Sequence, residues 1–124
     1  MELEIDIYRR QMDLFDCIDE ALEYIEKTTA SGDFETALTL LYDVKDAAGE
    51  IRASTEVVLT RLGEGALGLD EVFKGFVTSL DDMVASYETA NIEFILRIIT
   101  DRMQPSLSSY RKRIIELVGV EVSS

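Results

Sequence analysis

The sequence contains no histidine and no tryptophan, and it has one cysteine and one proline among its 124 residues. The absence of histidine excludes every catalytic or metal-binding mechanism that depends on an imidazole. A single cysteine can form neither an intramolecular disulfide bond nor a cysteine-cluster metal site. No apolar run reaches the roughly 18–20 residues that a membrane-spanning helix needs, and the first residues lack the features of a secretory signal. We therefore expect a cytoplasmic protein that does not bind a membrane.

Acidic residues outnumber basic ones by 25 to 12, which gives the chain a formal net charge of −13. A molecule with this charge repels phosphate backbones, so we expect no nucleic-acid partner. The exception is the segment 97–124, which has five basic and three acidic residues. Two interpretations remain open for it. Its cations either pair with helix C-termini and acidic neighbours, or they form a docking surface for an acidic partner.

Apolar residues follow helical spacing along almost the whole chain, and no segment alternates apolar and polar residues as a strand does. Gly32 suits the positive φ angle that often ends a helix. Asp33, Asp70 and Asn91 can each cap the helix that follows. We therefore predict an all-α fold with helices near residues 4–30, 34–62, 70–88 and 91–118. The predicted core residues are Phe15, Leu22, Phe34, Leu41, Ile51, Phe73, Leu80 and Ile99.

An internal repeat becomes visible when the sequence is aligned with itself at an offset of 58 residues. This offset places Phe15 on Phe73 and Leu22 on Leu80, and it places the turn triplet Ser31-Gly32-Asp33 on Thr89-Ala90-Asn91. Regular apolar spacing alone does not explain the coincidence of the two turns. The repeat therefore indicates two similar helical hairpins.

Two antiparallel hairpins of long helices predict a single domain, an antiparallel up-down-up-down four-helix bundle that spans residues 1–124. We expect the first hairpin at 4–62, a glycine-rich loop at 63–69, the second hairpin at 70–118 and a short tail at 119–124.

Pro105 falls inside the fourth predicted helix, where a proline removes a backbone donor and clashes with the preceding turn. It either kinks that helix or ends it, with a fifth helix starting near Pro105. The apolar pattern resumes after the proline with a shift in phase, which favours a bend.

The search for a catalytic or ligand site gives no positive support for an enzyme. Ferritin-like bundles bind iron through Glu-x-x-His pairs, which this chain cannot form. Cys17 lies beside acidic residues that disfavour a thiolate, so we interpret it as a packing residue. The glycines of the loop match the spacing of a dinucleotide fingerprint, but that motif needs a preceding strand. We interpret the acidic residues of the first helix as a solvated face: Asp16, Asp19, Glu20, Glu23 and Glu26.

We therefore expect no catalytic residue, no cofactor and no metal, and a protein that is not an enzyme. Several apolar residues nevertheless lie outside the strict core stripes. They either widen the core or cover an interface, and we favour an interface with a second copy, as a homodimer, or with a helical segment of another protein. These residues are Leu40, Val57, Phe94, Ile98 and Ile115.

The run Tyr87-Glu-Thr-Ala-Asn-Ile-Glu-Phe-Ile-Leu96, together with Ala21-Leu-Glu-Tyr-Ile-Glu26 and the following Ser-Gly-Asp turn, resembles the flagellin export chaperone family (FliS type). The resemblance implies a small bacterial helical bundle that binds protein. That family carries a tryptophan late in its fourth helix, which this chain lacks, and its N-terminal tyrosine would correspond to Tyr8. We therefore transfer the fold and the idea of protein binding, but no binding residues. Membership of an uncharacterised bacterial family is the alternative.

Overall fold

The computed structural model describes residues 2–62 and 69–119, and this part of the chain consists of helices and short turns without a strand. The predicted all-α class is confirmed. The glycine-rich segment 63–68 and the tail residues 120–124 lie outside the described residues. The α-helices are α1 (Glu2–Ala30), α2 (Phe34–Leu62), α3 (Leu69–Ser86), α4 (Ile92–Ile98) and α5 (Gln104–Ile114), with a 3₁₀ turn at Tyr87–Thr89 and π turns at Ile99–Met103 and Ile115–Gly119.

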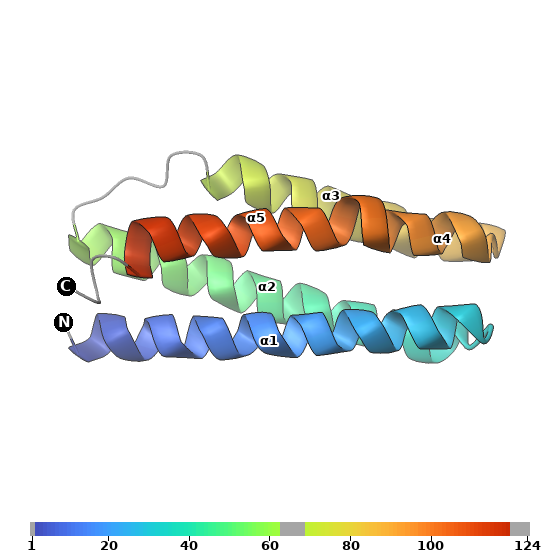
Figure 1. Cartoon of the computed structure of the whole chain (residues 1–124), viewed down its shortest axis with the longest axis horizontal. Coiled ribbons are helices and arrows are strands. Elements are labelled where there is room, and N and C mark those ends of the chain that lie inside the picture. Colours follow the sequence, from blue (N-terminus) through green and yellow to red (C-terminus); the bar gives the residue numbers. More distant parts are fainter. Residues whose placement is uncertain (1, 63–68, 120–124) are drawn as a thin grey trace.

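Four helical rods lie along one long axis: α1, α2, α3 and the continuous run from α4 to α5 (Figure 1). Helix α1 packs mainly against α2, and α3 packs mainly against α5. The chain reverses between α1 and α2 and again between α3 and α4. Each reversal takes only a few residues, so the two helices that it joins become neighbours.

The two reversals use the same local chemistry, as the sequence predicts. Gly32 has a φ angle of 84°, and Ala90 is the only other described residue in the left-handed region, at 54°. The backbone N–H of Thr36 donates to Asp33 Oδ1 at 3.3 Å. The N–H of Phe94 donates to Asn91 Oδ1 at 3.1 Å. Each carboxylate or amide oxygen therefore satisfies a donor that the first helical turn leaves free.

Six of the eight predicted core residues are buried, and the other two, Phe34 and Phe73, are half-buried against the core. The burial pattern of α1 recurs in α3 and the 3₁₀ turn that follows it, at the offset of 58. The buried residues Ile18, Leu22, Ile25 and Thr29 correspond to the buried Phe76, Leu80, Met83 and Tyr87.

The helix that contains Pro105 neither stops nor continues as a regular α-helix. The N–H of Gln104 bonds to the carbonyl of Ile99, five residues earlier, which widens the helix just before the proline. A proline has no N–H, and in a regular α-helix its ring would meet the carbonyl four residues before it. The π turn therefore lies where an α-helix could not continue, and α5 begins as a separate α-helix at Gln104.

This π turn also accounts for the phase shift in the apolar pattern, because it adds one residue to the second half of the chain. Before it, Ala37 and Leu41 of α2 correspond to Ile95 and Ile99 at the offset of 58. After it, the offset becomes 59. The buried Val44, Ala48, Ile51 and Thr55 then correspond to the buried Met103, Leu107, Tyr110 and Ile114.

Candidate functional site

A groove of about 390 Å³ lies between α1 and α5, directly after the π turn. We call it the α1–α5 groove. Phe15 and Leu107 are buried beneath it. Its complete lining is Phe15, Asp19 and Glu23 of α1 with Gln104, Leu107, Ser108 and Arg111 of α5.

Arg111 bridges the two helices at one end of this groove. Its Nη1 lies 2.9 Å from Asp16 Oδ1 and 3.7 Å from Asp19 Oδ2. Its guanidinium lies over the Phe15 ring, 5.6 Å from the ring centroid, at a distance where a cation and an aromatic face attract each other. At the other end, Gln104 Nε2 donates to Glu26 Oε1 at 3.0 Å. The groove is therefore crossed by polar bridges at both ends.

The carboxyl group of Asp19 is partly desolvated in this position. Burial raises its pKa above the ordinary value, against the lowering effect of the nearby Arg111, and the negative charges of Asp16 and Glu23 raise it further.

A second groove, of about 440 Å³, lies between α2 and α3 at the position that the repeat relates to the first. Arg52 lies over the Phe73 ring at 5.4 Å, just as Arg111 lies over Phe15. Arg52 also pairs with Asp70 at 3.6 Å and with Glu56 at 3.7 Å. The two halves of the chain therefore repeat an arginine–phenylalanine contact that joins one hairpin to the other.

Three of the predicted surface residues are exposed apolar side chains: Phe94 at 50%, Val57 at 48% and Ile115 at 40%. Leu40 is only half-buried and packs against the core. The assignment of Ile98 to this surface is wrong, because its side chain is 2% exposed. Helix α4 packs against both α1 and α3, so its buried face is wider than one stripe.

Among the described residues, three exposed large apolar residues lie outside the predicted set: Leu3, Tyr24 and Tyr42. All three fall off the core stripe of their helices, and that position is the signal that could have identified them. Cys17 is exposed, which overturns its interpretation as a packing residue. In the described part of the chain it lies beside small side chains at the junction of α1 and α2.

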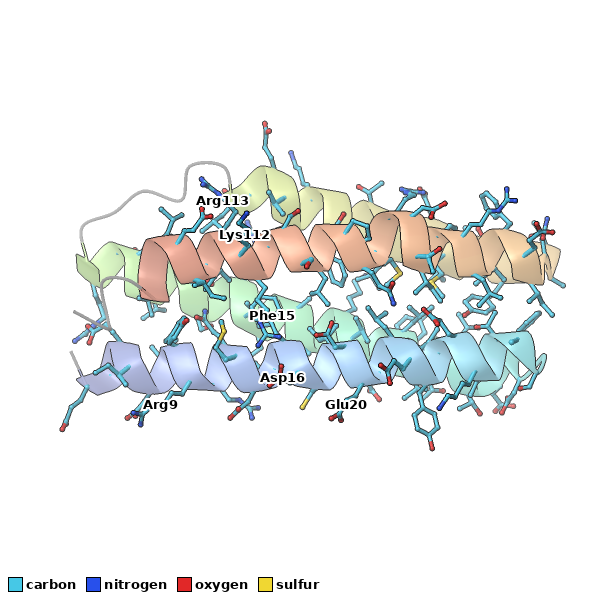
Figure 2. All side chains as sticks on the ribbon, in the orientation of Figure 1. Arg9, Phe15, Asp16, Glu20, Lys112 and Arg113 are labelled. Atoms are coloured by element: carbon cyan, nitrogen blue, oxygen red, sulfur yellow. The ribbon has the colours of Figure 1, made fainter. Side chains whose placement is uncertain are left out.

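The basic segment of α5 is largely paired within the chain. Arg111 is held by α1, and Arg113 pairs with Glu116 at 3.3 Å. Lys112 is exposed. Figure 2 shows Lys112 and Arg113 on α5, Phe15 between α1 and α5, and Glu20 on the outer side of α1. The pairing of Arg111 supports the first of the two interpretations given for this segment.

The acidic side chains of the described helices include no group of three or more that could hold a metal ion. No helix in residues 2–62 or 69–119 combines the length and apolar content that crossing a membrane requires.

The fold and the grooves define an all-α protein of two related helical halves. Two equivalent arginine–phenylalanine contacts join the halves. The chain belongs to the family described as Domain of unknown function (DUF8042), whose model matches residues 6–113. The match spans both halves, including the two turns and both arginines of the repeated contact. No curated protein and no solved structure matches the chain.

Proposed function

We propose that this protein is a non-enzymatic interaction module, of the chaperone or adaptor kind, that binds a partner helix or a second copy of itself through apolar side chains. The observation that carries the proposal is the half-exposed ring of Phe94, supported by the exposed Val57 and Ile115. A phenylalanine ring gains free energy when it leaves water, so an exposed one favours association.

The proposal includes the topology of an up-down-up-down four-helix bundle built from two similar hairpins. The equivalent turns, the shared burial pattern and the repeated arginine–phenylalanine contact support it. Bundles of this kind bind helices in the grooves between their own helices. The resemblance to the flagellin export chaperones points to the same activity, in a bacterial cytoplasm.

A structural homodimer is the second candidate, because a second copy could cover the same apolar side chains. An enzyme without a recognisable motif is the least favoured alternative. The charge of −13 keeps a monomer soluble without a covered surface, so association would serve recognition rather than solubility.

The experiment compares the wild-type chain with the double variant Val57→Glu/Phe94→Glu in sedimentation velocity at micromolar concentration, alone and with proteins of the native cell. The matched control is Thr39→Glu/Ala85→Glu, which adds the same charge at two exposed positions. We expect the test variant to weaken association about tenfold or more, a loss of about 1.4 kcal/mol or more. We expect the control to leave association unchanged.

A compact monomer that captures no protein would contradict the proposal. So would equal behaviour of the test and control variants. Circular dichroism checks that the helical content of each variant is intact.

A further inference from the structure

We propose that the α1–α5 groove receives lysine or arginine side chains of a basic helix in the partner protein. This inference rests on the proposed function and deepens it, because it names the chemistry of the partner. It concerns a different surface from the one tested through Phe94.

The middle of the groove has carboxylates that no cation in the described part of the chain contacts closely. Asp19 and Glu23 lie one helical turn apart on α1, and both line the groove. Asp19 has only a long contact of 3.7 Å to Arg111, which lies closer to Asp16. Glu23 has no ion pair or hydrogen bond among the described residues. Phe15 and Leu107 form the floor beneath them and are 0% and 4% exposed, so the groove offers a cation its carboxylates rather than apolar surface.

The surroundings of the groove also favour a cation. The α1–α2 half, residues 2–62, carries fifteen acidic and six basic residues. Glu26 extends the negative charge of α1 beyond Glu23, at the end of the groove where it accepts from Gln104. A positive partner is therefore attracted from a distance and is then held by carboxylates at short range.

The side chains that line the related groove between α2 and α3 carry a net charge of the opposite sign. Where the first groove has Asp19, the second has Val77. Its charged lining residues are Arg52, Lys74 and Asp70, which pairs with Arg52 at 3.6 Å. A basic helix would meet those cations. The repeat places the two grooves at equivalent positions, but their charges differ. We therefore expect only the α1–α5 groove to bind a basic helix, so the chain binds one such helix rather than two.

The partner segment is a helix because of the spacing on α1. Carboxylates at positions i and i+4 present charges about one helical turn apart, and lysines at i and i+4 of a second helix have the same repeat. A helix that lies along the groove can therefore pair with Asp19 and Glu23 at the same time.

The test uses a synthetic alanine-based helical peptide with lysine at every fourth position, and a twin peptide with glutamate in place of lysine. Binding to the full-length protein is measured by fluorescence anisotropy. The test variant is Asp19→Asn/Glu23→Gln. The matched control is Asp13→Asn/Glu20→Gln, which removes two charges of α1 outside the groove lining.

We expect the lysine peptide to bind with one-to-one stoichiometry and the glutamate peptide not to bind. The test variant should weaken binding about tenfold or more, and the control should change it less than about threefold, because surface charges outside the contact are screened by salt. If the double variant loses helical content, peptide binding by Glu23→Gln alone is compared with binding by the wild type and the control.

Absence of lysine-peptide binding would overturn the inference, and so would equal losses in the test and control variants. Failure of the groove assignment can be distinguished from failure of the proposed function. If the groove variant binds like the wild type while Val57→Glu/Phe94→Glu still abolishes association, the groove assignment fails and the interaction module stands. If neither variant changes any association, both fail.

Discussion

The hydroxyl of Thr29 and the phenol of Tyr87 lie 2.6 Å apart, and these two residues occupy equivalent positions in the repeat. This contact joins equivalent positions of the two halves, at the end of α1 and in the 3₁₀ turn that follows α3. The Phe34 ring lies edge-on to Tyr87, with 5.2 Å between ring centroids, and packs beside the same contact.

The Thr29–Tyr87 hydrogen bond should stabilise the pairing of the two halves. Both side chains are buried, and a buried hydrogen bond contributes about 0.5–1.5 kcal/mol. We expect a double-mutant cycle of Thr29→Val and Tyr87→Phe, measured by urea unfolding, to give a coupling free energy in this range. Coupling near zero would mean that the two groups do not interact in solution.

The π turn should tolerate the loss of one residue. Deletion of the exposed Thr100 together with Pro105→Ala would give a continuous α-helix and restore the offset of 58, so the buried residues from Met103 to Ile114 keep their positions. We expect the free energy of unfolding to fall by less than about 2 kcal/mol.

The control for this deletion is removal of Ser109, which is exposed in regular α-helix. That deletion rotates Tyr110 and Ile114 by about 100° out of the core. For each of these side chains the free energy of unfolding should fall by about 2–5 kcal/mol, as it does when a large buried side chain is truncated to alanine. Equal destabilisation by the two deletions would contradict the assignment of the π turn as an added residue.

Tyr110 should make the protein less stable in strong alkali. Its ring packs between Phe15 and Phe73, at centroid distances of 5.9 and 5.6 Å. Burial raises the pKa of its phenol to about 12 from the ordinary 10, against smaller lowering effects of Thr55 and Arg52. The folded protein therefore holds the proton after the unfolded chain has released it.

Stability from this group is complete below pH 10 and is lost as the pH rises toward 12. The loss is on the order of 2 to 3 kcal/mol. Urea unfolding across this pH range should show a steeper decline for the wild type than for Tyr110→Phe. The exposed Tyr24→Phe is the control and should follow the wild type. Parallel declines for Tyr110→Phe and the wild type would contradict the effect of burial.

The helices and their turns could be predicted because they depend on local chemistry. Apolar spacing fixes the buried face of each helix, and Asp33 and Asn91 cap within three residues of their own positions. The π turn was harder to predict, because Pro105 shows only that a regular helix cannot continue, and not that one extra residue restores the pattern.

The features that the sequence pattern missed depend on contacts between distant elements. Ile98 is buried because α4 lies against two other helices, which its own spacing does not reveal. The α1–α5 groove joins residues almost ninety positions apart, such as Asp19 and Ser108. Nothing in the local sequence of either helix indicates that they face each other across a cavity.

The most direct test of the central claim, that the exposed apolar side chains bind protein, is site-specific photo-crosslinking in the native cell. A photoreactive phenylalanine analogue replaces Phe94 in one strain and the neighbouring Glu93 in another, and both positions are exposed. The account predicts a defined adduct with a second copy or a partner protein from position 94, and a much weaker one from position 93. No adduct at position 94, or equal and diffuse adducts at both positions, would contradict it.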